Sequence, residues 1–476
     1  MNPSAVLDRP IDSIPPKPMT NFRFLLVMLT LTAVVGGIDA ASAQAVKEPP
    51  IWTQETLTGD WGGSRTALEK KGIEFGLNYI GETFSVPSGG LQRGTSFEGR
   101  FDAMINADLE KLFGWTGSKA HVRAFQIHNG GRNAADLVGS IADPSNIDAL
   151  ATTRLFTAWF QQDFGKSASV RIGQLAADDE FLVSNTAGGL INGTFGWATI
   201  MSANLPSGGP AYPLATPGVR LQVNPTEDFS ILAAVFSGDP AGANCNNFPQ
   251  VCNRYGTAFS FSGGAFWIGE AQYQVNQEKD AKGLAAAYKL GAWYHTGNFA
   301  DQHFGIDPAT GAILTLATTP TPDRLNRQGD WGMYGVIDQM LWRGDERSAS
   351  VFVRGGFAPS DRNLVSWYVD GGVGFKGLVP GRADDTLTLG VAHSNISKDA
   401  AALDRDTFLL NGSPFPIRTA ETVFELSYIL QMTPWWTVQP DLQYIVYPGG
   451  KVPDPKNLGV PVQDAFVLGV RSSVKF

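Results

Sequence analysis

Apolar and polar side chains alternate along most of this chain, most clearly between Glu421 and Met432. One face of this segment would carry Thr422, Phe424, Leu426, Tyr428, Leu430 and Met432, and the other Glu421, Val423, Glu425, Ser427, Ile429 and Gln431. Because successive side chains of a strand point to opposite sides of a sheet, this period of two predicts a β-strand with one apolar face. The same alternation recurs in the stretches 74–79, 100–109, 349–357, 367–376 and 386–391. The pattern therefore predicts an all-β protein.

Clusters of Gly, Pro, Asn and Asp separate the alternating stretches and predict turns and loops. They begin at Pro87 (PSGG), Gly238 (GDPAGANCNN), Asp307 (DPATGA), Pro380 (PGRADD) and Pro448 (PGGKVPDPKN). Several of these clusters are long, which is typical of a barrel with extended loops on one side. Because no Pro- or Ser-rich linker interrupts the alternating stretches, we expect one domain over residues 74–476.

The first residues of the chain predict export. An apolar run from Phe24 to Val35 follows Arg23, and Ala41-Ser42-Ala43 offers small residues at the cleavage positions. We therefore expect residues 1–43 to be a signal peptide that begins at Met19 and is cleaved before Gln44. Residues 44–73 would follow as a periplasmic segment, in which a capping Ser64 and a terminating Gly72 predict a helix of about two turns.

Export also places the two cysteines in an oxidising compartment. Cys245 and Cys252 lie in the turn-rich stretch CNNFPQVC, which predicts one disulfide at a loop tip. A redox or metal pair is the alternative, but no His or third Cys lies near them in the sequence.

Composition narrows the class of protein. A net charge of −9 disfavours binding to DNA, because that affinity comes mainly from Lys and Arg on phosphates. The mean hydropathy of −0.08 is that of a soluble protein, and a soluble β architecture would also show alternation. A membrane barrel, however, has a similar mean hydropathy, since only one face of each strand meets lipid. The final segment, AFVLGVRSSVKF, is amphipathic and ends on Phe476, which resembles the assembly signal of bacterial outer-membrane barrels and favours the transmembrane barrel.

Four longer stretches then carry a resemblance to a known family. They are LTGDWGGSRTALEKKGI (57–73), GRFDAMINADLEKLFGW (99–115) and the stretches 351–385 and 421–450. Together they resemble the carbohydrate-selective porins of the OprB type. The resemblance implies a transmembrane antiparallel β-barrel of about 16 strands in the bacterial outer membrane, through which sugars diffuse passively into the periplasm. It implies sugars and outer-membrane lipid as partners, assembly machinery that recognises Phe476, no cofactor and no reaction.

Candidate sugar contacts are the polar side chains expected on the lumen faces of the strands. Charged groups can pair with sugar hydroxyls, and an aromatic face can pack against sugar C–H groups. The candidates are Arg100, Asp102, Arg123, Arg171, Arg354, Asp370, Glu421 and Glu425, with Trp197 in a segment, 192–218, expected to narrow the lumen. The alternative for the charged residues is a wall of charges that only maintains the barrel and its water. For the segment around Trp197, the alternative is an ordinary outer loop.

Three other functions stay open at this point. An enzyme has little support, because the chain contains no H-E-x-x-H, G-x-S-x-G or P-loop motif, and paired acids occur by chance in a chain with 45 Asp and Glu. Scattered histidines and only two cysteines predict no metal site. A soluble lectin-like binder and a general or ion-preferring porin are the remaining alternatives. The net charge of −9 would favour cations at the mouths of a pore, whereas the arginine candidates would favour anions. The preferred sugar and the oligomeric state are left open.

Overall fold

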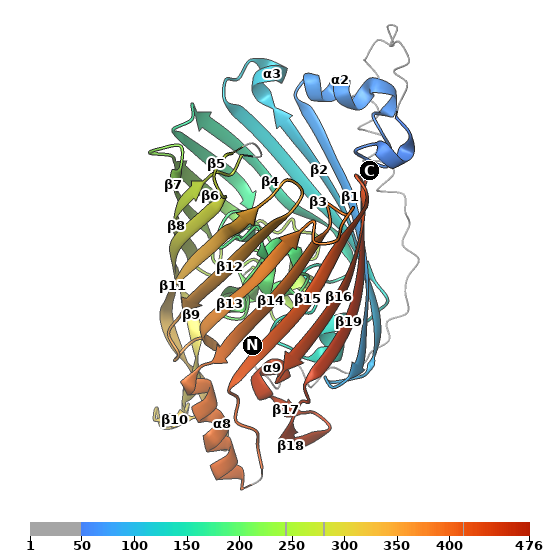
Figure 1. The fold of residues 1–476 in the computed structure, drawn as a ribbon. Helices are drawn as coiled ribbons and strands as arrows, with labels where there is room; N and C mark the ends of the chain where they lie inside the picture. Colours follow the sequence, from blue (N-terminus) through green and yellow to red (C-terminus); the bar gives the residue numbers. More distant parts are fainter. Residues whose placement is uncertain (1–48, 243–244, 279–280, 413) are drawn as a thin grey trace, which may run out of the picture.

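Sixteen long antiparallel strands close into a β-barrel (Figure 1). The computed structural model describes residues 49–242, 245–278, 281–412 and 414–476, so the predicted signal peptide lies outside the described residues. The long strands are β1 (Ile73–Ser88), β2 (Gly94–Asp108), β3 (Ser118–Asn129), β4 (Thr152–Phe164), β5 (Ala168–Leu175), β6 (Thr216–Val223), β7 (Phe229–Ser237), β8 (Ala265–Val275), β9 (Ala286–Ile306), β11 (Asp323–Arg343), β12 (Ser348–Phe357), β13 (Val365–Lys376), β14 (Thr386–Ile396), β15 (Ala420–Thr433), β16 (Trp436–Val446) and β19 (Ala465–Lys475).

Neighbouring strands pair in chain order, and the pairing of β1 with β19 closes the ring. A short strand, β10 (Ile313–Thr315), extends the edge of β9, and β17 (Pro453–Asp454) pairs with β18 (Asn457–Pro461) outside the barrel. None of the helices in the described part of the chain is long and apolar enough to span a membrane. The predicted antiparallel β-barrel is therefore confirmed.

The strand faces follow the predicted alternation. In β15, Glu421, Val423 and Glu425 are buried on the inside of the barrel, whereas Phe424 and Leu426 are exposed on the outside. The same division holds in β13, where Asp370 is buried and Val369 is exposed. An apolar outer face suits contact with lipid, and an inner face that carries charges suits a lumen. Period-two patterning thus predicts correctly which face of these strands is turned outward.

The two ends of the barrel differ in their connections. The end that carries the turns 109–117, 165–167, 224–228, 276–285, 344–347, 377–385 and 434–435 is called here the turn end. The other end, called the loop end, carries longer segments, among them 130–151, 176–215, 238–264 and 397–419. In Figure 1 the turn end lies at the top, with the C-terminus, and the loop end lies at the bottom. In outer-membrane barrels the short turns face the periplasm and the long loops face the outside.

Helices occur mainly in these connections. The turn end has η2 (Ile51–Thr53), η3 (Trp61–Gly63), α2 (Ser64–Lys70) and α3 (Leu109–Phe113). The connections at the loop end contain α4 (Ala134–Val138), η4 (Ala177–Asp179), η5 (Ala187–Gly189), α5 (Gly193–Gly196), α6 (Thr199–Ser202), η6 (Pro206–Gly208), α7 (Pro249–Cys252), α8 (Lys398–Asn411) and α9 (Pro448–Lys451). The disulfide between Cys245 and Cys252 lies in the connection 238–264 and agrees with the sequence prediction.

The N-terminal segment is attached to the seam where the barrel closes. Arg65 Nη2 donates to the carbonyl oxygen of Phe476 at 2.7 Å, and the indole N–H of Trp435 donates to Ile51 O at 2.7 Å. Helix α2 begins at Ser64, with Gly63 as its N-cap residue, and Asp60 Oδ1 accepts from Thr66 N in the first turn at 2.8 Å. The expected helix is present, with its start shifted by one residue.

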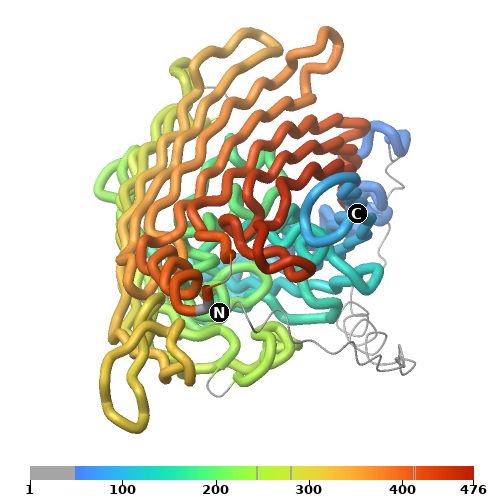
Figure 2. Tube along the Cα trace, turned by 90° about the horizontal axis from the view of Figure 1, so that it is seen from below, coloured from blue at the N-terminus to red at the C-terminus, as the bar shows by residue number. Residues whose placement is uncertain are grey.

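Two connections at the loop end fold back into the barrel. Seen from the loop end in Figure 2, the green segment that contains residues 176–215 lies inside the ring of strands. We call residues 130–151 and 176–215 the inward loops. Their buried apolar side chains, including Phe181, Leu190, Phe195 and Ile200, form one hydrophobic cluster with inner-face residues such as Phe352. The barrel interior is therefore partly a packed core and not an open water-filled cylinder.

Candidate functional site

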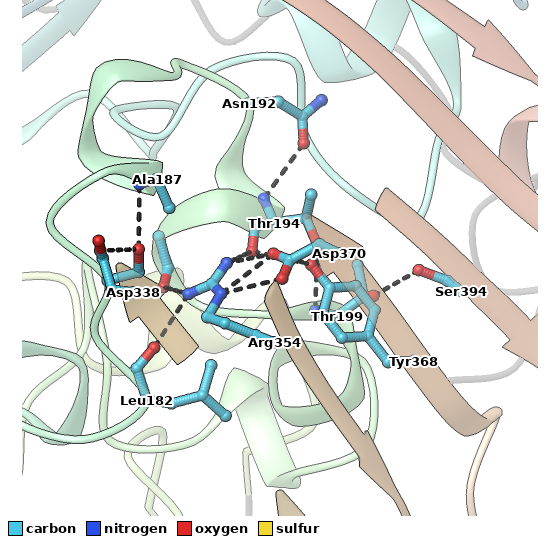
Figure 3. Close-up of polar contacts among 12 residues, drawn as sticks. Leu182, Ala187, Asn192, Thr194, Thr199, Asp338, Arg354, Tyr368, Asp370 and Ser394 are labelled. Carbon is cyan, nitrogen blue, oxygen red and sulfur yellow. Dashed lines mark hydrogen bonds and ion pairs between the residues drawn. The ribbon is translucent and has the colours of Figure 1, made fainter. Parts of the chain in front are cut away.

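One group of lumen-facing charges holds the inward loops against the barrel wall. We call Asp338, Arg354, Asp370, Glu421 and Glu425 the anchor group. Arg354 on β12 lies opposite Asp370 on β13 in the strand register, and its Nε donates to both carboxylate oxygens at 3.1 Å (Figure 3). Its remaining N–H groups donate to Leu182 O and Thr194 O, each at 3.0 Å. Because the Arg354 side chain is 1% exposed, it acts as a cross-link between wall and loop.

The carboxylates of the anchor group accept backbone N–H groups of the loops. Glu421 accepts from Ile141 N at 2.8 Å, Ala142 N at 3.0 Å and Gly449 N at 2.7 Å. Glu425 accepts from the consecutive N–H groups of Ile191 and Asn192. Asp338 accepts from Thr186 N at 2.8 Å and Ser184 Oγ at 2.6 Å. A loop whose backbone lies inside a barrel needs such partners, since unpaired buried N–H groups are costly.

The anchor group contains four of the sequence-predicted sugar contacts: Arg354, Asp370, Glu421 and Glu425. All four face the interior, as predicted, but they are at most 2% exposed and are hydrogen-bonded to loop backbone or to each other. This placement favours the alternative of a structural wall charge for these residues. Nothing in the alternating pattern distinguishes a lumen charge that meets water from one that meets a folded-back loop.

Trp197 lies in an inward loop, as expected, but its ring is packed into the hydrophobic cluster. The side chain is 8% exposed, and its indole N–H donates to Gly208 O at 3.0 Å. A ring in this position has little face to offer to a sugar and instead stabilises the loop that carries it.

A second group of charges lines the opposite part of the lumen, and several of its members remain in contact with water. We call it the charged cluster; it consists of Arg100, Asp102, Arg123, Arg171, Asp178, Asp179, Glu180 and Arg220. The arginines come from β2, β3, β5 and β6, and η4 with Glu180 just after it supplies three of the four acids. The exposed fractions of the side chains of Arg123 and Asp179 are 27% and 39%. This arrangement brings together Arg100, Asp102, Arg123 and Arg171, the other four charged candidates.

The side chains of the charged cluster pair with one another across the strands. Arg123 Nη2 lies 2.6 Å from Asp102 Oδ2, and Arg100 Nη2 lies 3.8 Å from the same oxygen. Glu180 lies 3.0 Å from Arg220 and 3.4 Å from Arg171. Four arginines thus face four acids, so the cluster presents many donors and acceptors with little excess of either charge.

Aromatic rings pack against the guanidinium groups of these arginines. The guanidinium of Arg100 lies 4.7 Å from the centre of the Phe125 ring and 4.9 Å from that of Tyr212. The guanidinium of Arg171 lies 3.9 Å from the ring centre of Trp159. Cations attract the faces of aromatic rings, and stacking limits the freedom of these long side chains. The rings therefore hold the donors at fixed places along the wall.

Sequence reasoning missed the acids of η4 and Arg220. Arg220 could have been found from alternation, because its neighbours Val219 and Leu221 are exposed on the outer face and place it inside. Asp178, Asp179 and Glu180 carry no such signal, since they lie after β5, where the strand period has ended. Their contribution depends on the inward fold of residues 176–215.

The fold and the lumen define a channel-forming β-barrel of the outer membrane. The family model described as carbohydrate-selective porin, OprB family, matches residues 92–476. The chain therefore belongs to the OprB family of carbohydrate-selective porins, as the sequence motifs indicated. Its place is the bacterial outer membrane.

The chain is also similar to two porins over most of its length, and its fold matches a solved structure. The chain is 27% identical to Porin B of Pseudomonas aeruginosa over 92% of this chain and 96% of the relative. It is 22% identical to the putative porin QuiX of Acinetobacter baylyi over 95% of this chain and all of the relative. Its fold matches the high-pH structure of Pseudomonas putida OprB with a TM-score of 0.78 and 24% identity, over 90% of this chain and 100% of that one.

Proposed function

We propose that the charged cluster is where a neutral sugar binds weakly as it passes through this porin. The carrying observation is that four arginines and four acids come together on one stretch of the lumen wall, where the side chains of Arg123, Arg171, Asp179 and Glu180 are between 18% and 39% exposed, while the anchor group is closed off by the inward loops. A sugar hydroxyl can both donate and accept, so a surface that alternates Arg donors with carboxylate acceptors suits it. A near balance of charge suits a neutral solute better than an ion.

The contacts in this cluster also fit transport better than tight capture. Each guanidinium already has a carboxylate partner, so a sugar replaces hydrogen bonds to water and competes with existing pairs. A passive channel needs this weakness, because the solute must leave as readily as it enters. On this proposal the protein carries out no reaction, and Glu180 and Asp102 position guanidinium groups in place of acting as acid and base.

Three further assignments accompany the proposal. Residues 1–43 are removed as a signal peptide, and residues 44–73 lie on the periplasmic side. Strand β19, with Phe476 at its end, is the segment that the outer-membrane assembly machinery recognises. Outer-membrane lipid covers the exposed apolar face of the strands, represented by Phe424 and Leu426.

Single-channel conductance in a planar bilayer tests the role of the charged cluster. The purified protein is titrated with glucose and then maltose, and the same titration is made for Arg171→Gln. Loss of one charged hydrogen-bond donor should raise the sugar concentration for half-maximal block roughly tenfold, or about 1.4 kcal/mol. Arg347→Gln is the matched control, because Arg347 is exposed in the turn 344–347, outside the lumen.

The outcomes separate this proposal from its nearest rival. Saturable block by sugar that weakens in Arg171→Gln but not in Arg347→Gln supports the charged cluster as the sugar site. Saturable block that is unchanged in Arg171→Gln places the sugar elsewhere. Stable conductance steps that do not respond to either sugar would indicate a general or ion-preferring pore instead.

A further inference from the structure

A separate cavity of about 560 Å³ opens where the lumen meets the turn end. Its barrel wall contains Glu74 on β1, Asn106 on β2 and Trp159 on β4. These positions share the inner face with the charged cluster, since Asn106 and Trp159 are both paired in register with His121, two residues before Arg123. A volume of this size is typical of sites that hold a small molecule.

The N-terminal segment supplies the outer wall of this cavity. Glu69 on α2 lines it, and α2 is held close to the barrel because Asp108 N donates to Gly72 O at 2.7 Å. Gly72 has a φ of +98°, and a Cβ there would lie 2.8 Å from Asp108 O. Only glycine allows this close approach of the α2 end to the barrel rim. The cavity is thus a defined feature of the fold and not a gap beside a loose terminus.

The residues that line the cavity supply both hydrogen-bond donors and acceptors. Lys111 and Lys119 contribute ammonium groups that are about half exposed, and Asn106 Nδ2 donates to Glu74 Oε2 at 3.2 Å. Asp108 accepts the N–H groups of Glu110 and Lys111, each at 3.1 Å. Because Asp108 and Glu74 already have partners from the chain, they do not form a ring of free carboxylates for a cation. The rim instead offers the mixed polar surface that suits hydroxyl groups.

Trp159 connects this cavity to the charged cluster. His121 stacks on its ring with a centroid distance of 4.8 Å, and Arg171 lies 3.9 Å from the ring centre. His121 and Arg171 come from the two strands that flank β4, and both contact the indole ring. Arg171 therefore belongs to the charged cluster and also contacts a residue that lines the cavity. A solute that leaves the cluster toward the turn end meets this cavity next.

We propose that this cavity is a second carbohydrate subsite, an exit site that holds a neutral mono- or disaccharide at the periplasmic mouth of the pore. The inference rests on the proposed function, because it takes the solute to be a sugar. The exit site is built by Glu69, Glu74, Asn106, Lys111 and Lys119, and it gives the otherwise unexplained N-terminal helix a role in the transport path. Two successive weak sites would let a sugar move in short steps, each with its own set of hydrogen bonds.

Protection of an introduced thiol from modification tests the exit site directly. Glu69→Cys and Glu74→Cys place one reporter on α2 and one on β1, both at exposed positions that line the cavity. The two native cysteines are joined in a disulfide and do not react with a methanethiosulfonate reagent. The full-length protein is kept in a detergent without a sugar head group, and modification is timed with and without maltose. Glu227→Cys, exposed in the turn 224–228 at the same end of the barrel, is the matched control.

The expected result is slower modification of both reporters and an unchanged rate at Glu227→Cys. At the maltose concentration that half-fills the site the rate should fall about twofold, because half of the thiols are then covered. Unchanged rates at Glu69→Cys and Glu74→Cys in saturating maltose would overturn the exit site. Equal slowing in the control would also overturn it, by showing a general effect of the sugar on the reagent.

Combining each reporter with Arg171→Gln separates this inference from the proposed function. If maltose still blocks conductance but does not protect the reporters, the exit site is wrong and the charged cluster stands. If maltose protects the reporters while block of conductance is unchanged by Arg171→Gln, the exit site stands and the role of the cluster is wrong. Lys119→Met, on the cavity rim, should weaken protection, whereas the exposed Lys166→Met at the turn 165–167 should not.

Discussion

On the lumen wall formed by β12 to β15, Arg354, Glu421 and Glu425 are buried and bind loop backbone, whereas on the wall formed by β2 to β6 Arg123 and Arg171 pair with acids and remain partly exposed to water. Arg354 is 1% exposed and has four backbone or carboxylate partners, while Arg123 is 27% exposed and pairs with Asp102. Both arginines sit on inner faces of strands that alternate in the same way. What distinguishes them is the inward loop 176–215, which covers one wall and supplies acids to the other.

This difference suggests how the porin combines stability with a permeable lumen. The wall formed by β12 to β15, called here the anchored wall, fixes the position of the inward loops. It does so through many hydrogen bonds to charged groups, which are stronger than neutral hydrogen bonds. The wall formed by β2 to β6, called here the open wall, then receives Asp178, Asp179 and Glu180 at defined distances from its arginines. The anchored wall therefore positions the inward loop that supplies three of the four acids of the charged cluster.

The largest effect is expected where the anchored wall loses its buried cation. Arg354→Leu would leave Asp370 as a buried carboxylate without its cation and should destabilise the folded barrel by about 3–5 kcal/mol. The measurement is the midpoint of thermal unfolding in detergent. Unfolding is monitored as the change from the folded to the unfolded band on a gel. Arg354→Leu combined with Asp370→Leu should recover part of this loss. Equal stability of Arg354→Leu and Arg171→Gln would contradict the division between the two walls.

A smaller effect is expected from loosening the loop while the Arg354 pair is intact. Glu425→Ala removes the acceptor of the Ile191 and Asn192 N–H groups, each of which would cost about 1–3 kcal/mol if left unpaired. Loop 176–215 should then move from the wall, so we expect a noisier and larger unit conductance and weaker block by maltose. Glu425→Gln keeps one acceptor oxygen, so its unit conductance and its block by maltose should lie between those of the wild type and those of Glu425→Ala. Wild-type conductance in Glu425→Ala would show that this contact does not position the constriction.

The smallest expected effect concerns a carboxylate that lies outside both walls, at the turn end. Burial alone would raise the pKa of Asp385, but hydrogen bonds from Arg382, from Tyr428 and from the Gln431 N–H outweigh it and lower that pKa below its usual range. A lowered pKa in the folded state means that Asp385 stabilises the fold above about pH 4 and that this stabilisation is lost as the pH falls further.

Asp385→Asn should therefore lower the unfolding midpoint at neutral pH by the equivalent of about 1 kcal/mol and have less effect near pH 3. The comparison is made by thermal unfolding of both proteins across this pH range. Asp384→Asn is the matched control, because Asp384 is 77% exposed in the same turn. A loss of stability that does not depend on pH would contradict an ionised Asp385 as the source.

Alternation along the chain was sufficient to predict the strands and the direction of their faces. Glu425, Arg354 and Asp370 lie inside the barrel next to apolar residues that are exposed on the outer face, and Glu421 follows from its place on the same face of β15 as Glu425. The short helix before β1 and the disulfide between Cys245 and Cys252 follow from equally local signals. The family motifs added the number of strands, which a period of two does not contain.

The roles of those residues were not predictable in the same way. Glu425 and Trp197 looked like sugar contacts because a charge and an aromatic ring in a sugar porin suggest that chemistry. In the structure Glu425 accepts N–H groups of residues more than two hundred positions earlier in the chain, and Trp197 is part of a buried cluster. Arg220 and the acids of η4 became visible as members of a site only when loop 176–215 was placed beside β2 to β6.

The sequence by itself therefore determined the class of fold, the inner and outer faces of the strands and the family of the chain. The physical reason is that lipid on one side and polar surroundings on the other impose a local period on every strand. Only the tertiary structure decided which lumen charges anchor loops, which meet water and where the N-terminal helix closes a cavity. Those outcomes depend on contacts between segments far apart in the chain, and no local pattern of side chains records which partner a buried charge will find.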